Sequence, residues 1–249
     1  MLRIASLALA LLASPVLRAD SALVAVASNF APALNALIAE FESTSGHALR
    51  VAAGSTGKLY AQIVQGAPFD MFLAADQARP RQLENSLHAV KGSRFTYARG
   101  RLALVSWDAL DEIAPEILRS TPFRRFAIAN PKTAPYGVAA IEVLRALELT
   151  ELIEPKLVRG ENVGQALAFV ASGNAEYGLV ALSVVRGGAF HGSLWKVPAA
   201  LHSPISQDAV LLERARDNPA ANGFLSYLRS EGARQRIAAM GYDTHSARQ

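Results

Sequence analysis

The sequence lacks cysteine altogether among its 249 residues, and this absence excludes several kinds of site. A chain without thiols has no disulfide, no thiol nucleophile, no thiolate metal site and no cysteine to carry a lipid. The histidines are scattered, without the close spacing of a zinc site, at His47, His88, His191, His202 and His245. We therefore expect no direct metal ligands and no lipid anchor.

Charged residues are also scarce, at 18% of the chain, whereas hydrophobic residues make up 51%. This balance is typical of a folded globular protein, and the length suits one large domain or two lobes of about 100 residues each. The formal net charge is only +4, and basic residues such as Arg79, Arg99 and Arg124 are dispersed among acids. A nucleic-acid partner is therefore not expected.

The N-terminal segment has the pattern of a signal peptide. Arg3 gives a short positive start, residues 4–17 are largely apolar, and Ala19 is a small residue at a plausible cleavage point. The apolar run is shorter than the ~20 residues that a membrane-spanning helix needs. We predict that residues 1–19 are removed, and that the mature chain is a soluble periplasmic protein, neither lipidated nor inserted in the membrane.

Beyond this segment, apolar runs alternate with helical patterns. The runs 22–27, 69–76, 126–129 and 177–182 are predicted strands, with amphipathic helices between them. Strands that alternate with helices indicate an α/β fold with parallel sheets and right-handed crossovers. In such sheets, ligands bind beyond the carboxyl ends of the strands, where helix N-termini converge.

Four of the predicted strand-to-helix junctions carry small polar or aromatic side chains. They fall at residues 28–29, 55–57, 136–137 and 162–163. The first turn of a helix has unpaired N–H groups and a partial positive charge, so each junction is a potential anion site. A helix cap explains any one junction equally well, and only their recurrence favours a shared ligand site.

The side chains at these junctions are serine, asparagine, threonine and tyrosine, which are neutral donors. An array of neutral dipoles can hold a dianion in a dry cleft without an ion pair, but it offers few acceptors. A proton on the ligand would therefore stay unsatisfied, at a cost of ~1–3 kcal/mol. This chemistry predicts a fully ionised oxyanion, such as molybdate, tungstate or sulfate, in preference to hydrogen phosphate.

Four motifs in the mature chain form a distinctive set: ASNF at 27–30, GSTGKL at 54–59, GAPFDMFLAAD at 66–76 and NPKTAPYG at 130–137. In order and spacing they resemble the periplasmic molybdate-binding proteins of ABC transporters over essentially the whole mature chain. The resemblance implies a two-lobed fold of the type II periplasmic-binding-protein kind. It also implies a monomer that is not an enzyme, binds molybdate or tungstate without a cofactor, and delivers the anion to an inner-membrane ABC permease.

The resemblance further implies six oxyanion-binding residues, among which Val163 acts through its backbone N–H. They are Ser28, Asn29, Ser55, Thr56, Tyr136 and Val163. One position departs from part of the family, because Ala181 stands where some members have a tyrosine. We expect Tyr136 to replace that tyrosine as the aromatic hydroxyl donor.

Two extended passages, near residues 98–106 and 203–212, are expected to cross between the lobes and to act as a hinge. On this basis, residues 20–101 and 206–249 form one lobe and residues 102–205 form the other. The ligand is expected in the cleft between them, where its contacts with both lobes favour closure.

Other functions stay open from the sequence alone. The same fold serves other oxyanions such as sulfate, and less plausibly a small hydrolase or transferase. A Gly-x-Ser-x-Gly signature is absent, and the glycine at position 54 stands too close to Lys58 for a Walker loop. Asp70 and Asp76 are expected to have structural roles rather than to form a catalytic pair.

Overall fold

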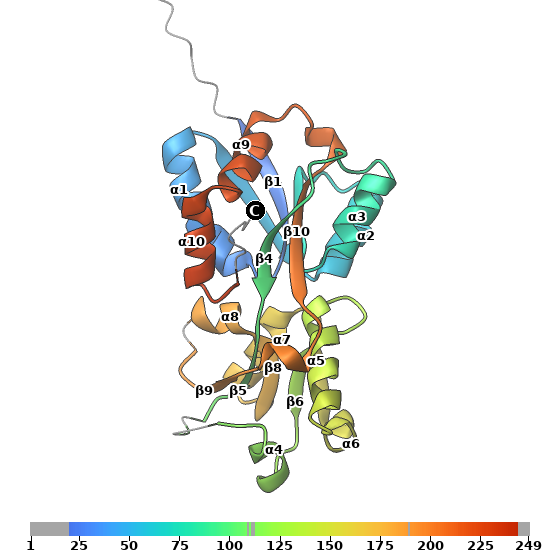
Figure 1. The fold of residues 1–249 in the computed structure, drawn as a ribbon, viewed down its shortest axis with the longest axis vertical. Coiled ribbons are helices and arrows are strands. Elements are labelled where there is room, and N and C mark those ends of the chain that lie inside the picture. The colour runs from blue at the N-terminus through green and yellow to red at the C-terminus, as the bar shows by residue number, and fades with distance from the viewer. Residues whose placement is uncertain (1–19, 109, 111–112, 189, 244–249) are drawn as a thin grey trace, which may run out of the picture.

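The computed structural model describes residues 20–108, 110, 113–188 and 190–243. These residues form two lobes along the long axis of the molecule, each a five-stranded sheet flanked by helices (Figure 1). The predicted signal peptide at 1–19 lies outside the described residues. Within the described ranges, no helix has the length and apolar character needed to cross a membrane. The architecture is the two-lobed α/β fold that the sequence predicts.

The sheet of the first lobe has the strand order β2-β1-β3-β10-β4. Its strands are β1 (Ser21–Ala27), β2 (Ala48–Gly54), β3 (Met71–Leu73), β4 (Phe95–Gly100) and β10 (Ile205–Leu211). The helices of this lobe are α1 (Ala31–Ser45), α2 (Thr56–Val64), α3 (Ala78–Asn85), α9 (Pro219–Leu228) and α10 (Glu231–Ala239). Both ends of the described chain therefore contribute to the first lobe.

The sheet of the second lobe has the order β7-β6-β8-β5-β9. Its strands are β5 (Leu102–Ser106), β6 (Phe126–Ala129), β7 (Leu157–Gly160), β8 (Tyr177–Ala181) and β9 (Ser193–Lys196). The helices are α4 (Ile117–Ser120), α5 (Pro135–Ala146), α6 (Thr150–Ile153), α7 (Val163–Ala171) and α8 (Leu182–Arg186). The second lobe is thus built from one continuous stretch of chain.

Each sheet is mixed, although the sequence indicates mainly parallel sheets. The strands β1, β2 and β3 are parallel, as are β6, β7 and β8. The pairs β3–β10, β10–β4, β8–β5 and β5–β9 are antiparallel. The physical reason is the change of lobe: β10 and β5 enter their lobes from the cleft, where the parallel strands end, so they must run the opposite way.

Successive residues of the first sheet point to opposite faces, and each face has its own helices. Val24 packs in a cluster with α1, α9 and α10, whereas the next residue, Ala25, packs with α2 and α3. On β10, Ala209 joins the first cluster and Val210 the second. This alternation decides where the polar residues of β10 lie.

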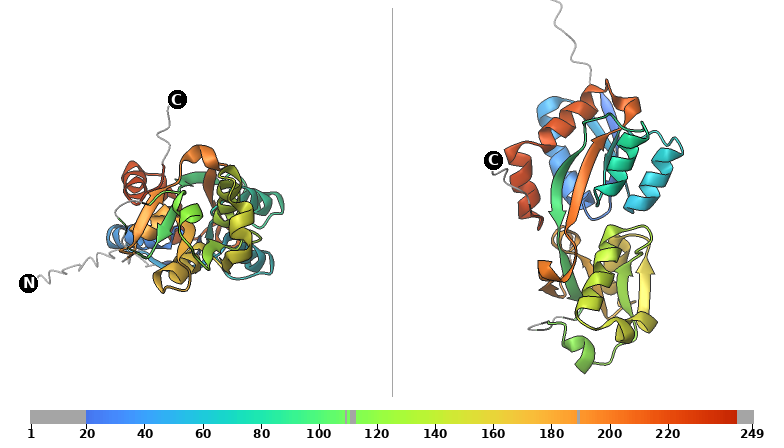
Figure 2. Two further views of the ribbon diagram at one scale, coloured as in Figure 1. Left: turned by 90° about the horizontal axis from the view of Figure 1, so that it is seen from below. Right: turned by 45° about the vertical axis from the view of Figure 1, so that its right-hand side comes forward.

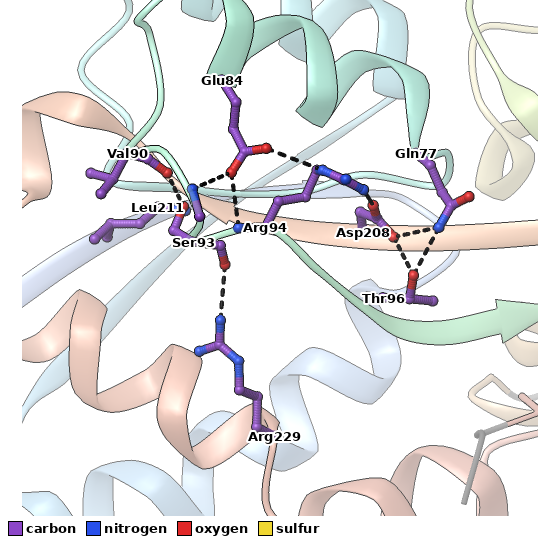
Figure 3. A network of polar contacts seen from close by, with 10 residues as sticks. Gln77, Glu84, Val90, Ser93, Arg94, Thr96, Asp208, Leu211 and Arg229 are labelled. Atoms are coloured by element: carbon purple, nitrogen blue, oxygen red, sulfur yellow. Dashed lines mark hydrogen bonds and ion pairs between the residues drawn. The ribbon is translucent and has the colours of Figure 1, made fainter. Parts of the chain in front are cut away.

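A polar network on the α3 face anchors β10 to its neighbours (Figure 3). The Asp208 carboxylate is fully buried, pairs with Arg94, and accepts from the Thr96 hydroxyl at 2.6 Å and the Gln77 amide at 3.2 Å. Arg94 also donates to Glu84 at 3.2 Å. A buried charge persists only when it is paired and hydrogen-bonded, so this network fixes the middle of β10 in the first lobe.

The chain crosses between the lobes twice. Arg101 alone separates β4 from β5, and residues 197–204 lead from β9 back to β10. The second passage contains a short 3-10 helix, Ala199–Leu201, so it is not extended throughout, and it precedes most of the passage predicted at 203–212. The strands β4 and β10 lie side by side at the crossing (Figure 2, right). Asp243 strengthens the first passage, because it exchanges backbone hydrogen bonds with Arg99 at 2.8 and 2.9 Å and pairs with Arg101.

Asp70 and Asp76 both bind groups of the fold, which agrees with their predicted structural roles. Asp70 accepts from the Leu23 backbone N–H at 2.7 Å and pairs with Arg214 at 2.7 Å. Asp76 accepts from the Arg79 backbone N–H at 2.9 Å, which secures the start of α3. Neither carboxylate is therefore held beside the other for acid–base chemistry.

Candidate ligand-binding site

The carboxyl ends of β1 and β2 face the starts of α5 and α7 across a small cavity between the lobes. All six residues that the sequence predicts for the site line this cavity. Its lining is Ala27, Ser28, Asn29, Gly54, Ser55, Thr56, Ala75, Ala134, Pro135, Tyr136, Asn162 and Val163. The cavity is small, with a volume of only about 10 Å³, so it suits a ligand of few atoms.

Ser28 and Ser55 bring hydroxyl groups to the cavity from the first lobe. The Ser28 backbone N–H donates to the Gly54 carbonyl at 2.9 Å, which ties the first two junctions together. The Ser55 Oγ is buried, and within the described part of the chain it has no hydrogen-bond partner. A buried hydroxyl without a partner costs about 1–3 kcal/mol, so Ser55 is poised to bind a ligand.

Thr56 begins α2 and offers two donors to the cavity. Its hydroxyl oxygen accepts from the Ala75 backbone N–H at 3.1 Å, which leaves the hydroxyl proton to be donated. Its own backbone N–H belongs to the first turn of a helix, where N–H groups have no intrahelical partner. Thr56 therefore fits the predicted role of a donor to an anion.

The Asn29 side chain is committed to a buried polar network. Its Nδ2 donates to Gln207 Oε1 at 2.8 Å and to the Tyr242 hydroxyl at 3.1 Å. Its backbone carbonyl accepts from the Tyr242 hydroxyl at 2.7 Å and from the Ser183 hydroxyl at 3.0 Å. Both amide hydrogens are thereby used, and the backbone N–H after β1 is the donor that Asn29 retains.

Two helix starts face the cavity from the second lobe. Tyr136 is the second residue of α5, directly after Pro135. Val163 is the first residue of α7, which Asn162 caps by accepting from the Gln165 backbone N–H at 3.1 Å. The cap serves the third N–H of the helix and leaves that of Val163 without an intrahelical partner.

Among the described residues that line the cavity, Tyr136 is the only titratable one, and none carries a carboxylate, ammonium or guanidinium group. Its side chain is buried, and its hydroxyl accepts from Gln207 Nε2 at 3.1 Å. Burial raises the pKa of Tyr136 well above its ordinary value, so the hydroxyl stays neutral and keeps its proton. The site is therefore an array of neutral donors.

This arrangement suits binding rather than chemistry. The lining contains no histidine or carboxylate to act as a general base for its hydroxyl groups. Across the described residues, no three His, Asp or Glu side chains gather in a way that would hold a metal ion. Helix starts and hydroxyl donors that converge on one small space are instead suited to a small anion.

Residues 22–243 match the family model of the bacterial extracellular solute-binding proteins. The chain belongs to this family. Curated relatives include the molybdate-binding proteins ModA of Azotobacter vinelandii, 47% identical over 88% of each chain, and of Rhodobacter capsulatus, 44% identical over 91% of this chain and 89% of the relative. The solved structure of an Azotobacter vinelandii periplasmic molybdate-binding protein matches with a TM-score of 0.85 and 38% identity, over 90% of this chain and 99% of that chain.

Family membership decides between binding and catalysis. Members of the family bind solutes, so this solute-binding protein is not an enzyme, and its site holds a ligand without a cofactor. The hydrolase and transferase alternatives are thereby set aside.

The solute-binding protein is in a closed conformation, because contacts cross the mouth of its cleft. The Gly57 backbone N–H on α2 donates to the Thr133 carbonyl of the second lobe at 2.8 Å. Next to it, Lys58 pairs with Glu161 at 2.8 Å. A methyl group on Gly57 would lie 3.0 Å from the Thr133 carbonyl oxygen, a contact close enough that the neighbouring lobe would have to shift by a few tenths of an ångström.

A larger cavity of about 320 Å³ opens beside the small one. The two share Ala75, Ala134 and Pro135 in their walls. The ion pair between Asp76 and Arg79 also lines the larger cavity. This cavity leads from solvent to the wall of the site in the solute-binding protein.

The residues behind the small cavity are absent from the sequence-based prediction. Ser183, Gln207 and Tyr242 contact Asn29 although 154, 178 and 213 positions separate them from it. The sequence carries one weak signal, which is the polar pair Gln207 and Asp208 directly before the apolar run 209–212. Its neighbours are known only once the fold is known.

Proposed function

We propose that this solute-binding protein binds molybdate, and tungstate as well, and delivers the anion to an ABC permease for import. The observation that carries the proposal is the small cavity lined by hydroxyls and helix starts and free of charged side chains. Such a lining favours a fully ionised tetrahedral oxyanion. The relatives at 47% and 44% identity, both called molybdate-binding, point to molybdate among such anions.

The proposed ligand contacts come from both lobes. In the first lobe, the hydroxyls of Ser28, Ser55 and Thr56 donate to the anion, together with the Asn29 backbone N–H. In the second lobe, the backbone N–H groups of Tyr136 and Val163 donate, and the Tyr136 hydroxyl replaces the tyrosine that some members have at the position of Ala181. The burial of these residues in one cavity lining supports the assignment.

The lobes proposed to close on the anion are residues 20–101 with 206–249, and residues 102–205. The membership of the strands in two sheets supports these limits. Only an anion that contacts both lobes stabilises the closed state relative to the open one. Binding and closure are therefore one event, with the passages at 98–106 and 203–212 as the hinge.

The proposed setting is the periplasm of a bacterium. Residues 1–19 act as a cleaved signal peptide, and the mature chain, which has no cysteine to carry a lipid, acts as a free monomer. Its macromolecular partner is the inner-membrane permease. Light scattering on the purified mature protein checks the monomer, and mass spectrometry of the exported protein checks the cleavage.

The test of function is calorimetric titration of the mature protein with molybdate, tungstate, sulfate and phosphate. We expect one-to-one binding of molybdate and tungstate that persists in a large excess of sulfate, and no binding of hydrogen phosphate. Effective competition by sulfate would assign the site to a different oxyanion. Absence of heat with all four anions would overturn the oxyanion proposal.

A further inference from the structure

Gln207 is a fully buried amide at the point where the site residues of the two lobes meet. It lies on β10, and its Oε1 accepts from Asn29 Nδ2 at 2.8 Å. Its Nε2 donates to the Tyr136 hydroxyl at 3.1 Å. One side chain outside the cavity lining therefore contacts a site residue of the first lobe and a site residue of the second.

The direction of the hydrogen bonds in this group follows from its chemistry, starting at the Asn29 carbonyl. A carbonyl only accepts, so the Tyr242 hydroxyl at 2.7 Å donates its single proton there. The Tyr242 oxygen is left to accept from the Asn29 side chain at 3.1 Å, which identifies that atom as Nδ2. The second hydrogen of Nδ2 then goes to the oxygen end of Gln207, at 2.8 Å.

The orientation of the Gln207 amide also fixes the direction of its hydrogen bond with Tyr136. Because its oxygen end faces Asn29, its nitrogen end faces the Tyr136 hydroxyl and donates to it. The Tyr136 oxygen thus accepts a proton from Gln207 and keeps its own to give. Tyr136 lines the cavity, and we take this proton as the one that it offers to a ligand there.

The strand that carries Gln207 is well placed to hold it still. Asp208, the next residue, is anchored on the opposite face of the sheet by Arg94, Thr96 and Gln77 (Figure 3). The pairing of β10 with β4 shifts register between Gln207 and Asp208. Bulges of this kind change the direction in which side chains point. The Gln207 side chain has a further contact on this face, because the Tyr97 hydroxyl lies 3.1 Å from Gln207 Oε1.

We propose that Gln207 is a positioning residue that makes Tyr136 a hydrogen-bond donor to the bound oxyanion. Gln207 also fixes the position of the Tyr136 side chain relative to Asn29. The inference rests on the proposed function and deepens it. It assigns part of the preference for an unprotonated anion to a residue that does not touch the ligand. The hydrogen bond from Gln207 to Tyr136 also joins the first lobe to the second.

Gln207→Glu tests the proposal, because the two side chains have the same shape. An ionised glutamate cannot donate, so the Tyr136 proton turns to the carboxylate, and the buried charge opposes a dianion. We expect the affinity for molybdate at pH 8 to fall about 100-fold, a loss of the size that follows when a buried charge or polar group is left unmatched. The affinity should recover in part towards pH 6, because burial raises the pKa of the new carboxyl group and its protonated form can donate.

Gln207→Met and Gln235→Glu complete the set of variants. Gln207→Met keeps the bulk without the polar atoms, and we expect about a tenfold loss of affinity without pH dependence, as for one lost hydrogen bond to a charged complex. Gln235→Glu makes the same chemical change as Gln207→Glu at an exposed position on α10, and we expect parent affinity. The thermal midpoint of each variant without ligand shows whether it folds.

The outcomes separate this inference from the function on which it rests. Titration of the parent with molybdate decides the function. If the parent binds and Gln207→Glu shows parent affinity with no pH dependence between pH 6 and 8, Gln207 does not set the donor and the inference is overturned. A pH-dependent loss in Gln207→Glu together with a pH-independent loss in Gln207→Met supports it, because charge repulsion alone would leave Gln207→Met at parent affinity.

Discussion

Ser55 shows how a single hydroxyl divides its effects between folding and binding. Its Oγ is buried at the junction of β2 and α2 and has no partner within the described structure. Without a ligand, such a group is a desolvated donor that destabilises the fold. With an oxyanion in the cavity, it makes a hydrogen bond to a charged group, which is stronger than a neutral one.

Ser55→Ala should therefore change stability and affinity in opposite directions. We expect the free energy of unfolding without ligand to stay level or rise by up to about 1 kcal/mol, because an unpaired polar group is removed. We expect the affinity for molybdate to fall by ~10- to 100-fold, since a charge-assisted hydrogen bond contributes about 1.5–3 kcal/mol. Urea denaturation and calorimetry measure the two quantities.

Ser172→Ala is the matched control for this change. Ser172 is exposed, and its hydroxyl donates to the Ala168 carbonyl at 2.7 Å at the end of α7, far along the helix from the cavity. Its affinity for molybdate should equal that of the parent. A Ser55→Ala protein that binds as tightly as the parent would remove Ser55 from the site.

At the scale of elements, strand-to-helix junctions were predictable because each depends on local sequence. A buried apolar run, a polar turn and a helical stripe lie within about ten residues of one another at 22–38 and 49–64, and the structure places strands and helices there. Parallel strands end at one edge, so the junctions were expected to meet. The grouping of residues 28, 55, 136 and 163 in one cavity follows from that rule.

The elements behind the cavity were not predictable, because their positions depend on contacts between distant parts of the chain. From the sequence, only residues 209–212 of this region form an apolar run, and the direction of β10 and its partners β3 and β4 follow only from the change of lobe. The register shift at Gln207 and Asp208 leaves no mark in the sequence. The hydrogen bonds of the Asn29 amide to Gln207 and Tyr242 could therefore not be predicted from the sequence.

Helices α1, α9 and α10 meet at a polar contact that contains two titratable groups with shifted pKa values, Glu40 and Tyr227. Glu40 on α1 accepts from the Tyr227 hydroxyl on α9 and pairs with Arg236 on α10 at 2.6 Å. The hydrogen bond from Tyr227, and then Arg236, lower the pKa of Glu40. Burial, and then the hydrogen bond to Glu40, raise the pKa of Tyr227 to about 12.

The signs of these two shifts define the prediction for Tyr227→Phe. A lowered carboxyl pKa gives stability above about pH 4.5 that is lost as pH falls through the folded-state value. A raised tyrosine pKa gives stability below about pH 10 that is lost as pH rises towards 12. Removing the hydroxyl should weaken both dependences, so urea midpoints at pH 3.5, 7 and 11 should differ less in the variant than in the parent.

Tyr60→Phe, on α2, serves as the control for the pH series. Tyr60 lies in the cluster on the other face of the sheet, away from Glu40 and Arg236. Its urea midpoints should keep the parent's dependence on pH. An unchanged pH profile in Tyr227→Phe would mean that the contact between the three helices does not govern stability at either extreme.

At the scale of the whole molecule, closure depends on how near the lobes come at Gly57. The Gly57 N–H bonds to the Thr133 carbonyl, and the neighbouring Lys58 and Glu161 form an ion pair with both side chains more than half exposed. Exposed ion pairs contribute only ~0–1 kcal/mol. Backbone approach at Gly57 therefore matters more than the charges beside it.

Gly57→Ala should impair closure without harming the fold. The new methyl group would meet the Thr133 oxygen and Cα at 3.0 and 3.1 Å, both of them backbone atoms of the opposite lobe. Alanine favours a helix over glycine by ~0.5–1 kcal/mol, so the ligand-free protein should be no less stable. We expect at least a tenfold weaker affinity for molybdate, and a smaller decrease in the radius of gyration on binding by X-ray scattering.

Lys58→Met provides the comparison for Gly57→Ala. It removes the exposed ion pair with Glu161 but leaves the backbone approach intact. We expect less than a fivefold loss of affinity, and a loss that disappears at high salt. Equal effects of Lys58→Met and Gly57→Ala would contradict the view that backbone contact at Gly57 limits closure.

The contact between Tyr242 and Asn29 also affects the order in which parts of the protein are completed during synthesis. A nascent chain supplies β1 and Asn29 early, but Tyr242 is among its last described residues, and the direction of the hydrogen bonds through Gln207 begins with it. Until Tyr242 has been made, the Asn29 amide and carbonyl lack this partner, so the network behind the cavity is completed only after almost all of the described chain has been synthesised.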